Sequence, residues 1–297
     1  AESETRLPVA GRIAAGHPLD RPARRGEALR IFTGAPLPEG PDTVVMQEDC
    51  RREGDEVIFG PGIKPGANRR LRAEDIRAGD AILETGIRLR PQDLGLAASV
   101  GRAELRVRKP LRIAVFSTGD EVCDPGDGAP AGCIFDSNRY TVSALLHNLG
   151  CRVTDLGILP DDFETIRKAL ETAARDHDVL ITSGGVSIGD EDHVKAAVDK
   201  LGSLHFWRIA IKPGRPIAMG RIGEAVFIGL PGNPVSAFMC FSNYVRPVLA
   251  TLQGTSSVSR TLTARSPERV VNTGKRTNFI RVTVEEHPNE LAVIREM

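Results

Sequence analysis

The clearest hydrophobic pattern in the chain begins just after Pro110. Leu111–Phe116 is a nearly continuous apolar run, which is typical of a parallel strand buried on both faces. Beyond it, apolar runs alternate with segments whose apolar residues recur at helical spacing. This alternation predicts an α/β domain with a doubly wound, mostly parallel sheet. The further strands are expected at residues 151–158, 179–181, 204–211, 217–219 and 225–229, and the helices at residues 138–149, 163–174, 191–201 and 234–252.

The segment before this domain carries only short apolar runs between Gly, Pro and Arg residues. Thr43–Met46 and Val57–Phe59 are examples, and they predict short strands of a small β domain. Further along, Pro91 is expected at the first position of a helix, and Leu105 and Val107 suggest a strand. We therefore expect a β-rich domain at 1–77, a linker-like domain at 78–109, the α/β domain at 110–257 and the start of a C-terminal β domain at 258–297.

Composition narrows the classes of protein. The 297 residues are enough for about two or three modest cores. Hydrophobic residues make up 41% and charged residues 26%, as in ordinary soluble proteins, and no stretch approaches the ~18 apolar residues of a membrane span. Basic and acidic residues both number 39, so no global positive field attracts nucleic acid. We expect neither a membrane nor a nucleic-acid partner.

The five cysteines are scattered, odd in number and contain no C-x-x-C pair. This argues against a disulfide framework and a structural zinc site, and favours a reducing, cytoplasmic location. The chain begins at Ala1 without methionine and stops at Met297 inside predicted β structure, so we expect a fragment.

Unusual residues gather in the loops that follow the predicted strands. Ligands of open α/β sheets bind beyond the carboxyl ends of the strands, so these loops are the candidate site. In chain order they are Ser117–Glu121, Pro160–Asp162, Ser183–Asp192, Lys212–Pro216 and Pro231–Pro234.

Each loop taken alone has a plain structural interpretation. Asp161 and Asp162 are better explained as helix caps. Gly184-Gly185 fits a tight turn about as well as a ligand cradle, and Lys212 and Arg215 alone would be read as solvated charges.

The conjunction of loops changes that interpretation. Asp120 and Glu121 are adjacent acids that repel unless a cation or hydrogen-bond donors compensate. Glycine loops and helix starts accept anions, and carboxylates on neighbouring loops supply the oxygen ligands that Mg²⁺ prefers. Lys212 and Arg215 add positive charge for an oxyanion. The residues themselves therefore predict a Mg²⁺-dependent enzyme acting on a phosphorylated ligand.

The order of the motifs carries a resemblance to one family. They run Thr33–Pro36, Arg72–Ile76, Ser117–Glu121, Asp136–Arg139, Ser183–Asp192, Lys212–Pro216 and Gly229–Ser236. In this order the chain resembles the molybdopterin molybdenumtransferases, which include the E domain of gephyrin and of plant homologues. The resemblance spans Leu7 to Met297. The T-G-D-E and G-G-V-S loops are shared with smaller pterin-adenylating relatives, whereas the motifs at Thr33 and at Glu74–Ile76 distinguish the larger enzymes.

The resemblance implies a reaction in molybdenum cofactor biosynthesis. Adenylated molybdopterin and molybdate would be consumed, and molybdenum cofactor and AMP released, with Mg²⁺ present. It also implies a homodimer, with the β domain of one subunit facing the α/β cleft of the other, and a molybdopterin adenylyltransferase as pathway partner.

The resemblance also implies roles for individual residues. Glu121, Asp161 and Asp192 match the acids around the metal and pyrophosphate, and Asp75 and Thr33 match further catalytic positions. The implied substrate-binding residues are Arg70, Thr118, Asp120, Ser183, Gly184, Gly185, Ser187, Arg208, Lys212, Arg215, Pro231 and Pro234.

Some positions depart from the family pattern. Arg215 stands where a second lysine is more usual, which replaces a point donor by a planar fork. Ala73 replaces a glycine, so it must either tolerate a positive φ or sit in a different turn. The family's Asp-Gly-Tyr-Ala segment would precede Ala1, and a Gly/Ser-rich part of the C-terminal domain would follow Met297.

Two alternatives from other classes share the α/β domain. One is a molybdopterin adenylyltransferase-like or pterin-binding protein, against which the β-rich flanks with Thr33 and Asp75 argue. The other is a scaffold in which partner binding dominates, for which the chain offers no long linker or added peptide-binding domain. Fold by itself separates neither from the transferase.

Overall fold

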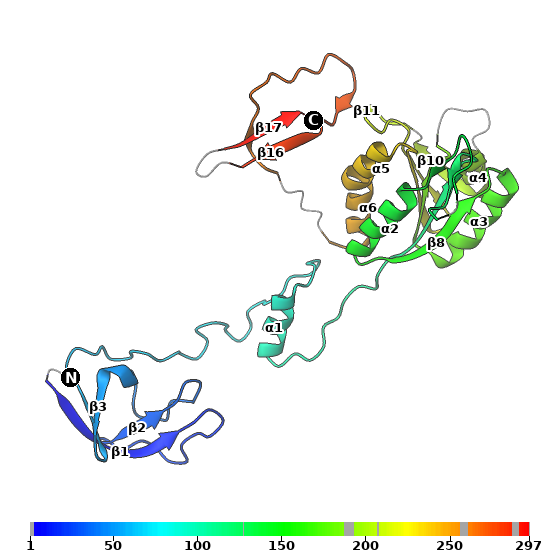
Figure 1. Ribbon diagram of the computed structural model, residues 1–297. Helices are drawn as coiled ribbons and strands as arrows, with labels where there is room; N and C mark the ends of the chain where they lie inside the picture. The colour runs from blue at the N-terminus through cyan, green and yellow to red at the C-terminus, as the bar shows by residue number, and fades with distance from the viewer. Residues whose placement is uncertain are drawn as a thin grey trace. The chain divides into compact units, whose positions relative to one another are not determined.

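A computed structural model describes residues 3–126, 128–186, 193–206, 208–255, 261–286 and 291–296. The chain divides into two compact units, the first ending at Ile82 and the second beginning at Leu83 (Figure 1). The finer division into four parts stays a prediction. Among the described residues, no helix is both long and apolar enough to span a membrane.

The first unit is built on a four-stranded sheet in the order β2-β1-β4-β3. Its strands are β1 (Thr5–Ile13), β2 (Ala28–Ile31), β3 (Cys50–Glu53) and β4 (Glu56–Phe59), and a short 3₁₀ helix, η1 (Gln47–Asp49), precedes β3. β3 and β4 form a tight hairpin through Gly54, whose φ of 60° suits the turn. Ile13 and Ile58 are almost fully buried and form the centre of this small core.

The second unit contains the predicted α/β domain. Its six-stranded sheet has the order β10-β12-β13-β9-β5-β8. β13, β9, β5 and β8 are parallel neighbours, and β10 and β12 extend the sheet as antiparallel strands. The strands are β5 (Arg112–Thr118), β8 (Arg152–Leu159), β9 (Val179–Ser183), β10 (Gly202–Phe206), β12 (Ala218–Ile222) and β13 (Ala225–Leu230).

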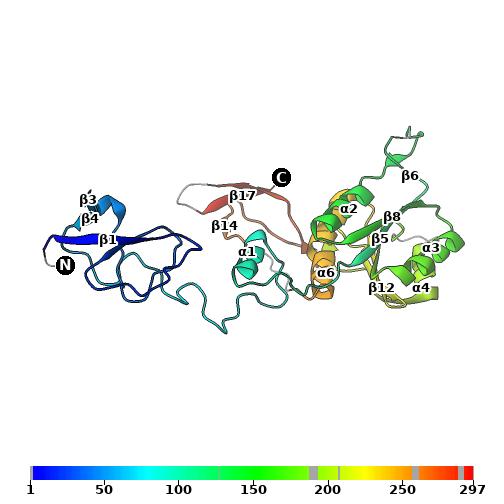
Figure 2. The same cartoon turned by 90° about the horizontal axis from the view of Figure 1, so that it is seen from below.

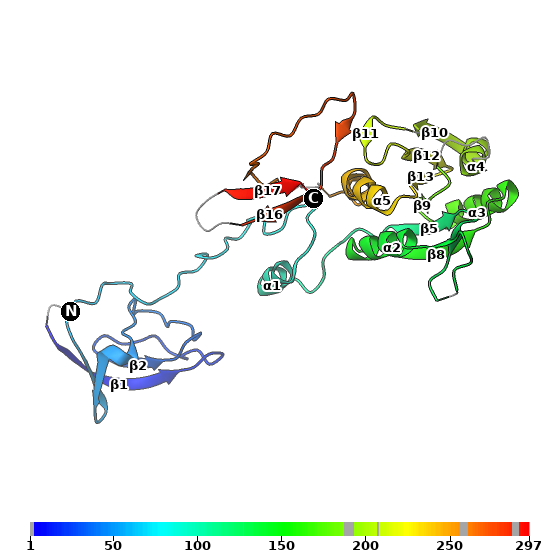
Figure 3. The same cartoon turned by 45° about the horizontal axis from the view of Figure 1, so that its top comes forward.

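Helices cover both faces of this sheet, as Figure 3 shows. On one face lie α2 (Asn138–Asn148), α5 (Pro234–Cys240) and α6 (Arg246–Leu252), and on the other α3 (Phe163–Asp176) and α4 (His193–Leu201). Successive residues of β5 alternate between the two cores: Ile113 packs in the first, and Phe116 in the second. The doubly wound α/β fold is confirmed.

Shorter elements complete the second unit. α1 (Pro91–Ser99) begins at Pro91 as predicted. A ribbon of two short parallel strands follows β5, and the part that carries β6 projects from the domain in Figure 2. The C-terminal residues form a three-stranded sheet in the order β14-β17-β16. The bounds of these short strands are β6 (Val122–Cys123), β7 (Ile134–Phe135), β11 (Ile211–Lys212), β14 (Ala264–Arg265), β15 (Thr277–Asn278), β16 (Val282–Glu285) and β17 (Ala292–Glu296).

Two predicted strands in the N-terminal third are wrong. Thr43–Met46 belongs to no strand: the Val44 N–H donates to Ala67 O at 3.0 Å, and the Val44 carbonyl accepts from the Asn68 side chain at 2.9 Å. Leu105 and Val107 lie in irregular backbone, with Val107 69% exposed. In both cases a short apolar run lacks a neighbouring strand to pair with in the described part of the chain, so it forms no strand.

Two predicted elements in the α/β domain are interrupted. The predicted strand 204–211 is β10 followed by the separate strand β11, which pairs in parallel with β15 instead of joining the large sheet. The predicted helix 234–252 contains a π-helical turn, η2 (Phe241–Val245), before α6. Pro247 lacks the N–H that a continuous helix requires, which accounts for an irregular turn at this point.

Candidate functional site

The candidate site lies along the carboxyl edge of the parallel strands. The strand pairing aligns the last residues of four strands: Thr118 is opposite Leu159, while Ser183 is opposite both Ser117 and Leu230. The loops that follow these residues therefore begin side by side. Four of the five predicted loops are brought together in this way.

The fifth loop, Lys212–Pro216, was predicted to follow a strand of the same sheet, and this is wrong. Lys212 belongs to β11, which is paired with β15 outside the six-stranded sheet. The loop nevertheless packs closely on α5. A Cβ added to Gly214 would lie 2.4 Å from the Cys240 sulfur.

The first two loops meet through a side-chain contact. Thr118 is buried, and its hydroxyl donates to Asp161 Oδ1 at 3.5 Å. Asp161 itself is exposed. Its neighbour Asp162 caps α3, accepting from the Thr165 N–H at 2.8 Å, and this backbone hydrogen bond holds the Asp162 pKa below its usual range. The capping interpretation therefore holds for Asp162, which leaves Asp161 available for a ligand.

The glycine loop after β9 approaches β5 through its backbone. Gly184 has φ 88°, and a Cβ at this position would be 2.7 Å from the Thr118 carbonyl oxygen. Gly185 has φ 64°, and its Cβ would be 2.6 Å from the Thr118 methyl group. The Gly184 N–H donates to Leu230 O at 3.2 Å. The two glycines are thus required for close packing of three strand ends, whatever else they bind.

The loop after β13 lies beside this glycine loop. A Cβ on Gly232 would be 4.0 Å from the Gly184 Cα, and the Gly232 carbonyl accepts from the Asn138 side chain at 2.7 Å. Asn233 caps α5, its side chain accepting from Ser236 N–H at 3.1 Å, with Pro234 at the first helical position as predicted. Pro231 is buried and Pro234 exposed.

Glu121 lies at the base of the projecting ribbon. Its carboxylate lies against Gly119, where an added Cβ would be 2.6 Å from Glu121 Oε2. Both Glu121 and Asp120 are exposed, and neither has an ion pair among the described residues. Glu121 and Asp161 therefore follow adjacent strands, β5 and β8, as exposed carboxylates near one edge.

A pocket of about 570 Å³ lies beside α5. Lys212, Asn233 and Ser236 line it from the α/β domain, and residues of the C-terminal strands and loops, including Arg269 and Arg281, line it from the other side. Arg215 is not among the described residues that line this pocket. It is exposed, and its backbone carbonyl oxygen accepts hydrogen bonds from the Ile209 and Ile217 N–H groups.

The remaining predicted residues are placed as follows. Thr33 is exposed in the turn after β2, and Arg70 donates to Asp75 at 3.1 Å in an exposed ion pair of the first unit. Arg208 is exposed. Ser187 and Asp192 lie outside the described residues. Among the described residues, no group of three acids, histidines or cysteines is arranged to hold a metal ion.

Sequence reasoning missed several residues that the structure brings to these loops. Asn138 and Arg139 belong to the quoted Asp136–Arg139 motif, but spacing gave no indication of their partners. Arg269 and Arg281 come from a part of the chain where only strands were predicted. The Asn138–Gly232 contact, the contacts of Arg139 with Asp124 and Asp155, and the lining of the pocket join residues that are not near neighbours in the sequence, so no local pattern signals them. The Arg139–Asp136 contact spans only three residues, and its spacing was the one available signal.

Comparison with known proteins gives a consistent result along the chain. Residues 114–251 match the family described as "Probable molybdopterin binding domain", and residues 1–101 match "MoeA N-terminal region (domain I and II)". A molybdopterin molybdenumtransferase of Haemophilus influenzae is 47% identical over 249 residues, which are 84% of this chain and 62% of the relative. One from Nostoc is 33% identical over 286 residues, 94% of this chain and 66% of the relative.

A solved structure, the molybdopterin biosynthesis MoeA protein of Pyrococcus horikoshii, matches with a TM-score of 0.78 and 30% identity. The match covers 98% of this chain and 72% of that one. The chain spans less than two thirds of the length of the two curated relatives.

Proposed function

Because this chain belongs to the molybdopterin molybdenumtransferase family, we propose that it inserts molybdate into adenylated molybdopterin and releases AMP, with Mg²⁺ required. The observation that carries the proposal is the alignment of Thr118, Leu159, Ser183 and Leu230 at one edge of the sheet. This edge gathers carboxylates, glycine backbone and helix starts, the groups that recognise a metal-bound pyrophosphate.

The donor chemistry at this edge fits Mg²⁺. Glu121 and Asp161 are exposed carboxylates after adjacent strands, and Mg²⁺ usually takes one or two protein carboxylates together with water and phosphate oxygens. We propose that these two acids hold the ion, with Asp192 as the third candidate. Bound there, Mg²⁺ would neutralise charge on the pyrophosphate. Asp120, beside Glu121, would add to the negative charge that favours a cation at this position.

The phosphate-binding part of the site is proposed to be the glycine loop. Ser183, Gly184 and Gly185 lie where β9 ends, and glycines there allow backbone groups to approach an anion without a Cβ in the way. Thr118 sits between this loop and Asp161, and its hydroxyl would orient the acid toward the metal. The buried Ser117 hydroxyl has no hydrogen-bond partner among the described residues, which is unusual and fits an edge completed by a ligand.

The pocket beside α5 is proposed to bind the oxyanion. Lys212, Arg269 and Arg281 give it positive charge, and Asn233 and Ser236 add polar groups at the start of α5. Molybdate is a dianion, and charge-assisted hydrogen bonds from such groups are the strong ones. The family resemblance alone supports a role in the proposed site for five further residues: Arg215, Arg208, Arg70, Asp75 and Thr33.

The setting of the reaction is also proposed. None of the five cysteines, all of which lie in the described residues, forms a disulfide, and we propose the reducing cytoplasm as the location. A molybdopterin adenylyltransferase would supply the adenylated substrate. We further propose a homodimer, which sedimentation of the protein at micromolar concentration tests; a monomer under those conditions would contradict it.

The test of the metal assignment uses Glu121→Gln, which keeps the shape of the side chain and removes its charge. AMP release from adenylated molybdopterin should be abolished while the circular dichroism spectrum is unchanged. The matched control is Glu224→Gln, because Glu224 is 99% exposed in the turn between β12 and β13, away from the carboxyl edge. Unchanged turnover in Glu121→Gln, or tight Mg²⁺ binding to the protein alone by calorimetry, would contradict the assignment.

The test of the oxyanion pocket uses Lys212→Ala. Losing one charge-assisted contact should weaken oxyanion binding by ~1.5–3 kcal/mol, or roughly ten- to a hundredfold. The molybdate concentration for half-maximal turnover should rise accordingly, with nucleotide binding nearly unchanged. The control is Lys200→Ala, because Lys200 is an exposed residue of α4. An equal loss of nucleotide affinity would assign Lys212 to the phosphates.

Adenylation of molybdopterin with ATP by the unaltered protein would instead favour an adenylyltransferase-like activity.

A further inference from the structure

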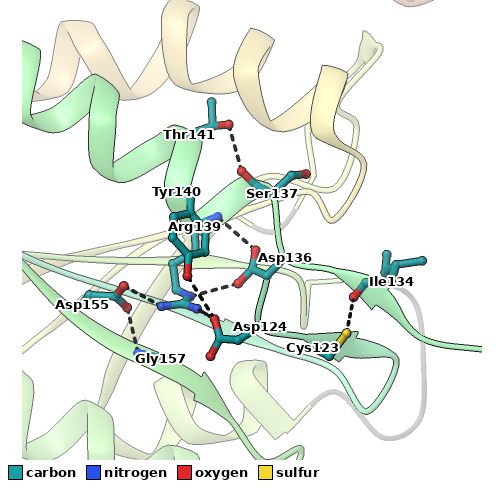
Figure 4. Close-up of polar contacts among 10 residues, drawn as sticks. All are labelled: Cys123, Asp124, Ile134, Asp136, Ser137, Arg139, Tyr140, Thr141, Asp155 and Gly157. Carbon is teal, nitrogen blue, oxygen red and sulfur yellow. Dashed lines mark hydrogen bonds and ion pairs between the residues drawn. The ribbon is translucent and has the colours of Figure 1, made fainter. Parts of the chain in front are cut away.

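Arg139 is the most deeply buried arginine side chain with ion pairs in the described part of the chain, at 5% exposure. It is the second residue of α2, and Figure 4 shows its guanidinium surrounded by three carboxylates. Nε donates to Asp136 at 3.0 Å, Nη1 to Asp155 at 2.5 Å, and Nη2 to Asp124. The Tyr140 ring lies 5.1 Å from the guanidinium carbon. A buried group with this many contacts is held in one position.

Two of the three carboxylates close the ribbon that carries Glu121. Asp124 directly follows β6, and Asp136 directly follows β7. Between the strands, Ile134 N–H donates to Glu121 O at 2.7 Å, and Asp136 N–H donates to Cys123 O at 2.9 Å. Arg139 therefore binds the ends of both strands of the ribbon, immediately beyond the backbone from which Glu121 projects.

The third carboxylate lies in β8, the strand that leads to Asp161. Pairing with β5 matches Val115 to Asp155 but Ser117 to Ile158, so β8 contains one extra residue, a β-bulge. Asp155 holds this bulge by accepting from Gly157 N–H at 2.8 Å, and Gly157 has φ 78°. The bulge shifts the pairing of the later residues of β8 with β5 by one position. It therefore sets where the loop with Pro160 and Asp161 leaves the sheet.

The charges in this cluster depend on one another. Burial raises the pKa of Asp155, but the hydrogen bonds from Arg139 and from Gly157 N–H outweigh it and lower the pKa. Asp136 is 3% exposed, and a buried carboxylate without its cation is strongly destabilising. A lysine at position 139 would carry a compact point charge in place of the planar guanidinium, so it would form hydrogen bonds with fewer of the three carboxylates.

We propose that Arg139 is a positioning residue that fixes Glu121 and Asp161 relative to each other. It fixes Glu121 through the ribbon ends and Asp161 through the bulge of β8. The proposal rests on the proposed function, in which these two acids hold Mg²⁺. It adds a residue that touches neither metal nor substrate and that acts through Asp124, Asp136 and Asp155.

The test compares Arg139→Lys and Asp155→Asn with a control, Arg167→Lys. Arg167 also bonds two carboxylates, Glu164 and Glu171, but all three belong to α3. AMP release is measured against Mg²⁺ concentration and, separately, against molybdate concentration. Amide hydrogen exchange of residues 119–124 and 134–136 is measured on the same proteins without substrate. Asp155→Asn tests the idea if Arg139→Lys fails to fold, because Asp155 is half-exposed.

Arg139→Lys should raise the Mg²⁺ concentration for half-maximal AMP release by about tenfold or more, as expected when a residue that orients metal ligands is lost. Asp155→Asn should shift it in the same direction by less, and Arg167→Lys should leave it unchanged. The half-maximal molybdate concentration should stay within about twofold, since Lys212 and its pocket are untouched. A merely structural role would lower the amount of active protein without moving the Mg²⁺ midpoint.

The proposal is overturned if the Mg²⁺ midpoint is unchanged in both variants, or if exchange in the ribbon is unchanged in Arg139→Lys. If the unaltered protein releases no AMP, the proposed function fails. In that case faster exchange of the ribbon amides in Arg139→Lys, relative to Arg167→Lys, still supports the positioning role, and equal exchange refutes it.

Discussion

Gly184→Ala is the substitution for which the structure gives the sharpest expectation. Gly184 has φ 88°, and its new Cβ would lie 2.7 Å from the backbone oxygen of Thr118. A non-glycine residue in the left-handed region costs about 1–2 kcal/mol. The clash is with backbone, which cannot rotate away, so β9 and β5 must separate at their ends; such overpacking typically costs another ~1–3 kcal/mol. We therefore expect a loss of roughly 2–5 kcal/mol in the free energy of unfolding.

Gly150→Ala separates the two contributions. Gly150 has φ 78° but nothing within 4 Å of an added Cβ, so it should show the backbone strain alone. Urea unfolding followed by far-ultraviolet circular dichroism gives the free energy of unfolding of each variant. The difference between the two variants measures the close approach of the strand ends. If Gly184→Ala is no less stable than Gly150→Ala, the strand ends are not packed as described, and the argument for a glycine-lined edge fails.

Three further outcomes are expected. Ala73 has φ 64°, so Ala73→Gly should raise the thermal midpoint of the first unit by relieving left-handed strain, and a lower midpoint would contradict this. The Thr165 N–H lowers the Asp162 pKa, so the charged cap stabilises α3 at pH values above the unfolded-state pKa, and this stabilisation is lost as pH falls through the lower, folded-state pKa. In urea titrations, the stability difference between Asp162→Asn and the unaltered protein should therefore begin to shrink below about pH 4. Burial raises the pKa of Cys240 to about 12, so at pH 8 its thiol should resist alkylation while Cys133 reacts, as peptide mass spectrometry would show.

Ala73, where the family pattern has a glycine, is a position whose backbone conformation the sequence left open. The sequence offered two outcomes, a strained alanine or a different turn, and the structure shows a positive φ. The turn is held by Glu74, whose backbone N–H donates to Leu71 O while its side chain accepts from Leu71 N–H. The hydrogen bonds of the turn decided the outcome, and side-chain identity alone did not.

The sequence by itself determined the features that depend on neighbouring residues. Buried strands such as Leu111–Phe116 follow from apolar runs, and the caps at Asp162 and Asn233 follow from one side chain bonding an N–H three residues on. The alternation of strand and helix then determined the doubly wound sheet, and with it the edge where Thr118, Ser183 and Pro231 meet.

The tertiary structure decided everything that depends on which distant segments pair. The bulge in β8, the pairing of β11 with β15, and the contacts of Arg139 with Asp124 and Asp155 are set by packing between elements. An apolar run such as Thr43–Met46 becomes a strand only if another strand lies beside it to take its hydrogen bonds, and none does. Hydrophobic periodicity reports which side of an element is buried, but it carries no information about which partner buries it.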